Sequence, residues 1–300
     1  MNRAVQRFAC TQCGKCCNRS PEVLLSEAAA LADIFVFRLM FRLYSLPHQV
    51  NDYITLDERA NTSAIFFEKK RLLGAFAARR YRTKMWRDEK LVQYTKYLMI
   101  SALAVDTRPG ACSALSGKRC GIYDRRPLSC RTVPFHYSRA QGLMEAGLKA
   151  FVETPGYECD TSETAEIITA DGQIVAPEIK AARSAAIALT EGDRRWNEAI
   201  VRRMNASSSA THYLPNLQEI ETSAHLGVMT TSMRVAWRIA ADVRLIAPDE
   251  CDRIAESQLY AIDRELGAGK CSQDAREMLS EMRAEYRQQP NRGHAIAVNA

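Results

Sequence analysis

Ten cysteines occur among the 300 residues of this sequence, and four of them lie within eight residues, at Cys10, Cys13, Cys16 and Cys17. Two cysteines separated by two residues can bend onto one metal ion, and Gly14 suits the tight turn that such a loop needs. Three cysteines at this spacing are also typical of the loop that holds three corners of an iron–sulfur cluster. Clustered cysteines in a reducing compartment indicate metal binding or redox chemistry rather than disulfide bonds.

The doubled Cys16 and Cys17 favour two metal centres. Side chains of adjacent residues leave the backbone in diverging directions, so both are not expected to ligate a single metal ion. Either one of the two cysteines is not a metal ligand or there are two metal centres. Four more cysteines bring the number of thiolates to eight, enough for two four-ligand sites: Cys112, Cys120, Cys130 and Cys159. Cys251 and Cys271 stand alone in helical segments and are predicted to be packed thiols.

Seven cations flank these cysteines in sequence and would offset the negative charge of four-thiolate sites: Lys15, Arg19, Lys118, Arg119, Arg125, Arg126 and Arg131. His136 follows Cys130 by six residues and leaves three roles open, as a metal ligand, as a donor to a ligand, or as a packed or surface histidine. Thiolates suit zinc and iron–sulfur clusters alike, and the repeat of three cysteines favours iron–sulfur over zinc.

Two stretches of the sequence resemble the CxxCxxCC family of zinc- or iron-chelating proteins, the YkgJ-like proteins: residues 8–17 (FACTQCGKCC) and residues 120–134 (CGIYDRRPLSCRTVP). The resemblance covers roughly residues 5–160 and implies metal chelation through eight cysteines, with Cys112 leading into the second block and Cys159 as the eighth. Two features depart from the family. Ninety-four residues separate Cys17 from Cys112, and Glu158 and Asp160 flank Cys159 where the family has a Pro-Gly pair.

The net charge of +6 is concentrated in residues 67–96, which hold ten basic and three acidic residues. Tyr81, Trp86 and Tyr94 are interleaved with these cations, a pattern that would suit nucleic acid or another polyanion. The alternative is an amphipathic helix with a solvated charged face. One positive surface is expected in either case.

We expect an α+β protein that is predominantly helical. A cysteine-cluster metal-binding domain with short strands over 1–177 carries a basic helical insertion at about 32–105, and a helical domain follows over 178–300. Apolar spacing predicts helices from Glu27 to Leu46 and from Glu68 to Leu103. Asp171 and Gly172 predict a β-hairpin within 166–175. Pro248 is expected to begin a helix.

At 25% charged and 47% hydrophobic residues, the sequence is that of a globular chain rather than a disordered or fibrous one. No stretch is long and apolar enough for a membrane span, and no secretory leader is recognised, so we expect a cytoplasmic protein. Neither a dinucleotide-binding nor a P-loop glycine motif occurs.

Metal chelation is the function that the sequence favours. One alternative is an iron–sulfur enzyme similar to the flagellin lysine methylases, which would imply S-adenosylmethionine and a protein lysine substrate. The other is a metal-scaffolded module whose residues 67–96 bind a polyanion or nucleic acid.

Overall fold

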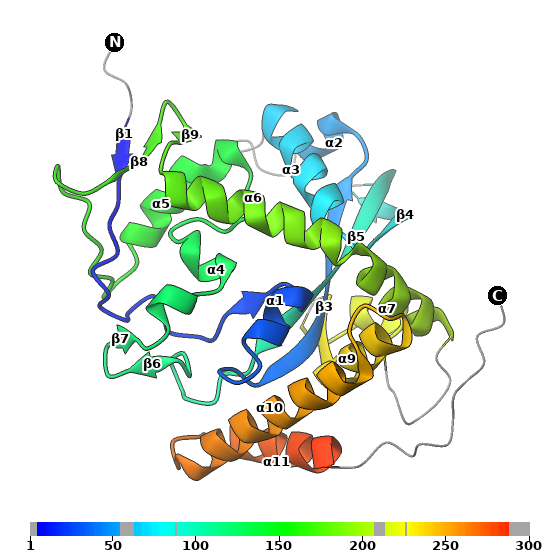
Figure 1. The fold of residues 1–300 in the computed structure, drawn as a ribbon. Helices are drawn as coiled ribbons and strands as arrows, with labels where there is room; N and C mark the ends of the chain where they lie inside the picture. Colours follow the sequence, from blue (N-terminus) through cyan, green and yellow to red (C-terminus); the bar gives the residue numbers. More distant parts are fainter. Residues whose placement is uncertain (1–4, 55–62, 88, 207–213, 226, 288–300) are drawn as a thin grey trace.

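A five-stranded antiparallel sheet forms the centre of the computed structural model, which describes residues 5–54, 63–87, 89–206, 214–225 and 227–287 (Figure 1). Strands β3 (Phe37–Pro47) and β5 (Lys90–Ala104) pair along the whole of β3. On the free side of β3 lies β10 (Val228–Ser232). The other side of β5 pairs with two strands, β4 (Arg79–Arg87) near its start and β2 (Glu22–Val23) near its end.

The prediction of two long helices, over residues 27–46 and 68–103, is wrong. The first is a short helix, α1 (Leu25–Ala30), followed by β3, and the second is α3 (Ser63–Phe76), followed by β4 and β5. Arg38 and Arg42 lie four residues apart, a spacing that places them on one face in either a helix or a strand. Pairing between β3 and β5 decides the outcome, because it buries Phe37, Leu39 and Phe41 on the opposite face.

The prediction of a predominantly helical protein is wrong as well. Helices make up 46% of the described residues and strands and bridges 22%, so several antiparallel sheets share the architecture with the helices. The error follows from the insertion, where the basic segment is helical only up to Phe76 and then forms a long hairpin of β4 and β5. The hairpin predicted within 166–175 is confirmed as β8 (Ile167–Ala170) and β9 (Gln173–Ile174), with positive φ at Asp171 and Gly172.

Two smaller sheets lie at the cysteine-bearing end of the chain. Strand β1 (Val5–Arg7) pairs with β8, while β6 (Leu115–Ser116) and β7 (Arg119–Cys120) form a short hairpin. Short helical turns connect them: η1 (Tyr123–Arg125), α4 (Leu128–Arg131), η2 (Gln141–Leu143) and α5 (Met144–Val152). One further helix, α2 (Val50–Ile54), follows β3.

The last third of the described chain is mostly helical and contains α6 (Pro177–Gly192), α7 (Arg194–Ala206), α8 (Leu217–Glu221), α9 (Met233–Asp242), α10 (Pro248–Gly267) and α11 (Gln273–Arg287). Helix α10 begins at Pro248, which confirms that prediction. Helices α10 and α11 run side by side at the lower edge of Figure 1. No helix among the described residues has both the length and the apolarity needed to cross a membrane.

The main core joins the sheet to these helices. Trp237 on α9 is fully buried and packs 5.4 Å from Trp196 on α7, in one apolar cluster with Phe37 and Leu39 of β3. The division of the chain near residue 177 remains a prediction, and β10 lies in the same sheet as β3 and β5.

Candidate metal centre

The eight cysteines predicted as ligands lie on loops and short elements at one end of the chain. Cys10, Cys13, Cys16 and Cys17 occupy the loop between β1 and β2, and the others follow β5, end β7, lie in α4 and follow α5: Cys112, Cys120, Cys130 and Cys159. All ten cysteines of the chain are free thiols, and of these eight only Cys10 is fully exposed. The donors therefore remain available for a metal.

Backbone contacts bring the start of the cysteine loop to Cys159. Ala9 and Asp160 form an antiparallel bridge with N–O distances of 2.8 and 3.1 Å, so Cys10 and Cys159 are the next residues on the two facing segments. The Thr11 hydroxyl donates to the Glu158 carbonyl at 2.7 Å. Cys159 departs most from the family pattern in sequence, but the backbone places it opposite the first cysteine of the loop.

Burial, followed by the negative charge that Cys16, Cys13 and Cys10 would carry as thiolates, raises the pKa of the Cys159 thiol to about 11. Burial also acts to raise the pKa of Cys13, but hydrogen bonds from the Lys15 backbone and the Thr11 side chain outweigh it and lower the pKa. Cys10, Cys13 and Cys16 thus act on Cys159, and these four cysteines form a first set.

The other end of the loop meets the second cysteine block. The Cys112 amide donates to the Cys17 carbonyl at 2.8 Å, although ninety-four residues separate the two positions. The short hairpin then places Cys120 opposite Leu115, three residues beyond Cys112. Burial is the main cause that raises the pKa of Cys130 to about 12, and the negative charges of Cys112 and Cys120 act in the same direction. The second set is Cys17, Cys112, Cys120 and Cys130.

The adjacent Cys16 and Cys17 connect the two sets. Their thiols are hydrogen-bonded to each other, which lowers the pKa of Cys16 and raises that of Cys17. Beyond this contact, Cys17 is influenced by Cys112 and Cys130, whereas Cys16 acts on Cys159. The two thiols therefore touch each other, while Cys16 acts toward Cys159 and Cys17 toward the second block.

Of the flanking cations, Arg126 acts on thiols of both sets, because its charge lowers the pKa of Cys16 and of Cys130. The guanidinium lies 3.8 Å from the centre of the Tyr123 ring, and its Nε donates to the Tyr123 carbonyl at 3.0 Å. Arg126 also pairs with the Glu178 carboxylate at 3.4 Å, which lies 3.8 Å from Arg131, while Arg125 pairs with Asp33 at 3.5 Å.

Gly14 packs the first cysteine loop onto the second block. Its φ of +74° lies in the left-handed region, and a Cβ added there would collide with the Lys118 carbonyl oxygen in the turn between β6 and β7. Any other residue would force these two segments apart. The glycine expected to allow a tight turn thus also permits a close approach of two backbones.

The half-buried carboxylate of Glu27 holds the helix that carries Cys130, and the buried carboxylate of Asp193 holds the helix that carries Glu27. The Glu27 carboxylate, on α1, accepts a 2.6 Å hydrogen bond from the Leu128 amide at the start of α4. The Asp193 carboxylate, after α6, accepts one from the Ser26 amide at 3.2 Å. Burial raises the pKa of both acids. No sequence pattern links residues 101 positions apart, so the sequence analysis did not find these positioning residues.

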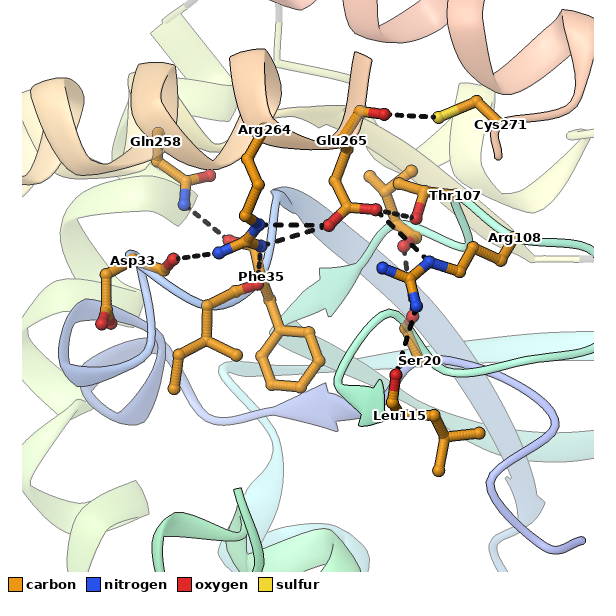
Figure 2. A network of polar contacts seen from close by, with 12 residues as sticks. Ser20, Asp33, Phe35, Thr107, Arg108, Leu115, Gln258, Arg264, Glu265 and Cys271 are labelled. Carbon is orange, nitrogen blue, oxygen red and sulfur yellow. Dashed lines mark hydrogen bonds and ion pairs between the residues drawn. The ribbon is translucent and has the colours of Figure 1, made fainter. Parts of the chain in front are cut away.

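A polar network ties α10 to the loop before Cys112 (Figure 2). Glu265 is only 2% exposed, accepts a hydrogen bond from the Thr107 hydroxyl at 2.7 Å and lies 3.8 Å from the Arg108 guanidinium. Arg108 in turn donates to the Leu115 carbonyl in β6 at 3.2 Å. The second cysteine block is thereby connected to the C-terminal helices.

His136 and the two isolated cysteines lie apart from both sets. The His136 ring is 2.7 Å from the Ser138 hydroxyl through Nδ1, and burial followed by nearby arginines lowers its pKa to about 4. The Cys271 thiol donates to the Glu265 carbonyl at 3.3 Å, and Cys251 packs against the main core. No described contact joins these three residues to the eight cysteines.

The donor set fits a thiophilic metal. Eight free thiols lie in two neighbourhoods, and tetrahedral zinc and iron–sulfur clusters both take four thiolates. Among the described residues, however, no three His, Cys, Asp or Glu side chains are gathered closely enough to hold a metal ion as they stand. Metal binding therefore requires the thiols of each set to move closer together, and all eight lie on loops or short elements.

Comparison with known proteins identifies the family through this cysteine region. No curated protein and no solved structure matches the chain. Residues 9–160, which include all eight cysteines, match the family model described as "CxxCxxCC: Putative zinc- or iron-chelating domain". That match spans just over half of the chain and begins and ends at the bridge between Ala9 and Asp160. The chain therefore belongs to the CxxCxxCC family of zinc- or iron-chelating domains.

Proposed function

We propose that this protein chelates metal at two four-cysteine centres, one held by Cys10, Cys13, Cys16 and Cys159 and the other by Cys17, Cys112, Cys120 and Cys130. Family membership supports metal binding by this region. The observation that carries the division into two sets is the pair of backbone closures at opposite ends of the cysteine loop. Cys10 faces Cys159 at one end, and Cys17 accepts from the Cys112 amide at the other.

The chemistry of the donors favours an iron–sulfur cluster over zinc, although four thiolates suit both. Three cysteines of the first set repeat at intervals of three, as in loops that hold iron–sulfur clusters. Arg126 supplies positive charge between the sets, where each four-thiolate centre would carry net negative charge. A reducing compartment such as the cytoplasm would keep these thiols available for metal.

Anaerobic purification followed by analysis of iron, zinc and sulfide tests the proposal. Iron with matching sulfide and a broad visible absorption band is the expected result. About two zinc ions per chain in a colourless protein would retain the two centres and reject the cluster. A chain that carries neither metal would refute chelation altogether.

Single variants test how the eight ligands are divided. Cys13→Ser, in the first set, and Cys130→Ser, in the second, are each expected to lose about half of the metal, because each leaves one four-cysteine centre complete. Cys251→Ser is the matched control and is expected to keep all of it. Complete loss in both ligand variants, with unchanged circular dichroism, would show one shared centre, and full retention in both would overturn the ligand assignment.

A further inference from the structure

The β4–β5 hairpin carries a row of cations on one face. Alternate residues of a strand point to the same face, so Arg80, Arg82, Lys84 and Trp86 share one side of β4. All four side chains are exposed, and that of Trp86 is 75% exposed. We call Arg80, Arg82 and Lys84 the cationic row, with Trp86 at the position that continues it toward the hairpin turn.

The cationic row differs from the neighbouring Lys96 in its ion pairs. Within the described ranges, no carboxylate forms an ion pair with any of its three members. Lys96 on the neighbouring strand is different, because it is buried and paired with Glu221 of α8. The charge of Lys96 is thus neutralised by Glu221 inside the fold, whereas the charges of the cationic row face solvent and remain available to an anionic partner.

A cavity of about 240 Å³ opens beside the row. Its lining is polar and cationic, and consists of His48, Arg82, Thr83, Lys84, Gln93 and Tyr94. The His48 amide donates to the Gln93 carbonyl at 2.7 Å, which fixes the end of β3 against the hairpin. Guanidinium and ammonium groups suit phosphate, while the Gln93 amide and the Tyr94 ring suit a base.

We propose that this face binds single-stranded nucleic acid, with phosphates along the cationic row and a base stacked on Trp86. Residues two apart on a strand are spaced by about 7 Å, so the row presents its charges in an extended line. A groove of cations with an exposed aromatic ring is the recognition mode for single strands without sequence preference. The proposal does not rest on the metal, because none of the eight cysteines lines this cavity.

Binding of a fluorescein-labelled oligothymidylate of about 20 nucleotides, followed by anisotropy with the full chain as purified, tests the proposal. The affinity is expected to fall with salt at a slope near −2, since each of three neutralised phosphates contributes about −0.7 for a single strand. The double variant Arg82→Ala/Lys84→Ala is expected to reduce the affinity about tenfold or more and to make the slope shallower by about 1.4.

The control removes the same charge elsewhere. Lys180 on α6 and Arg202 on α7 are exposed, and the double variant Lys180→Ala/Arg202→Ala is expected to bind as the parent does. A loss of affinity equal to that of the Arg82/Lys84 variant would show attraction by net charge alone and would overturn the site.

Tryptophan fluorescence supplies an independent readout. The chain has three tryptophans, of which Trp196 and Trp237 are buried, so quenching by oligothymidylate should report on Trp86. Trp86→Leu is expected to abolish the quenching and to weaken binding about tenfold. Quenching that persists in this variant would overturn the stacking role. Binding to vesicles of anionic phospholipid with none to the oligonucleotide would overturn the proposal in favour of a membrane surface.

Discussion

Replacing Gly14 by alanine tests whether the first cysteine loop must lie directly on the second block. The change has two costs. A residue with a Cβ at φ +74° loses about 1–2 kcal/mol in the left-handed region. The new Cβ would also overlap the Lys118 carbonyl oxygen and lie 3.2 Å from the carbonyl carbon, and such overpacking costs about 1–3 kcal/mol more.

Gly117 separates these two costs. It lies in the same turn as Lys118 with φ +62°, but a Cβ added there meets no atom within 4 Å. Gly117→Ala should therefore bear the backbone cost alone. We expect Gly14→Ala to lower the free energy of unfolding by about 2–5 kcal/mol and Gly117→Ala by about 1–2 kcal/mol.

Urea unfolding followed by circular dichroism measures both values, and elemental analysis measures the metal retained. Gly14→Ala is expected to lose metal along with stability, because it separates the segments that carry Cys13 and Cys120. Gly117→Ala should retain its metal. Equal destabilisation by the two substitutions would refute the close approach of the two blocks.

Two further predictions concern groups away from the cysteines. The folded pKa of His136, about 4, lies below its ordinary 6.5, so only the unfolded chain takes up a proton between these values. The contribution of neutral His136 to the free energy of unfolding is therefore complete above pH 6.5 and is lost as the pH is lowered, with a loss of about 2 kcal/mol at pH 5. Urea unfolding of His136→Gln should show a shallower pH dependence, and an unchanged profile would contradict the assignment. Glu265→Ala is expected to destabilise the fold by about 3 kcal/mol, because it leaves Arg108 and Thr107 without their partner. Thr107→Val should cost only about 1 kcal/mol, and equal costs in thermal unfolding would contradict a central role for the carboxylate.

The cysteine pattern was readable in the sequence because metal ligation imposes local spacing. The intervals among Cys10, Cys13 and Cys16 would suit a loop that bends onto one metal centre, and such a spacing does not depend on the rest of the fold. The count of eight cysteines predicts two four-cysteine sets, but it does not predict which cysteines share a set. The facing of Cys10 and Cys159 depends on a bridge between segments 151 positions apart. Glu27 and Gly14 position the cysteines through contacts with distant segments in the same way.

The long insertion was misread because its apolar residues fit two periodicities. On β3 every second residue is buried, at Phe37, Leu39 and Phe41, as in a strand. Arg38 and Arg42, however, are four residues apart, which is also the spacing of two residues on one face of a helix. The eleven-residue pairing between β3 and β5 decides between these possibilities. At the end where Phe37 pairs with Ala104, it joins residues more than fifty positions apart in the sequence. Helices after residue 177 were easier to predict, because proline and glycine mark their limits locally.

The contact between Cys17 and Cys112 has a consequence for the order in which the protein is made. A ribosome adds about 5–20 residues per second, so the first four thiols precede Cys112 by roughly 5–20 s. Cys130 and Cys159 come later still, so the set of Cys17, Cys112, Cys120 and Cys130 can be complete only after residue 130 has been added, and the set that includes Cys159 only after residue 159. During that interval the N-terminal loop carries reactive thiols with no partners from the second block. The nascent chain is therefore most vulnerable to oxidation, or to capture of the wrong metal, before the insertion has been synthesised and folded back.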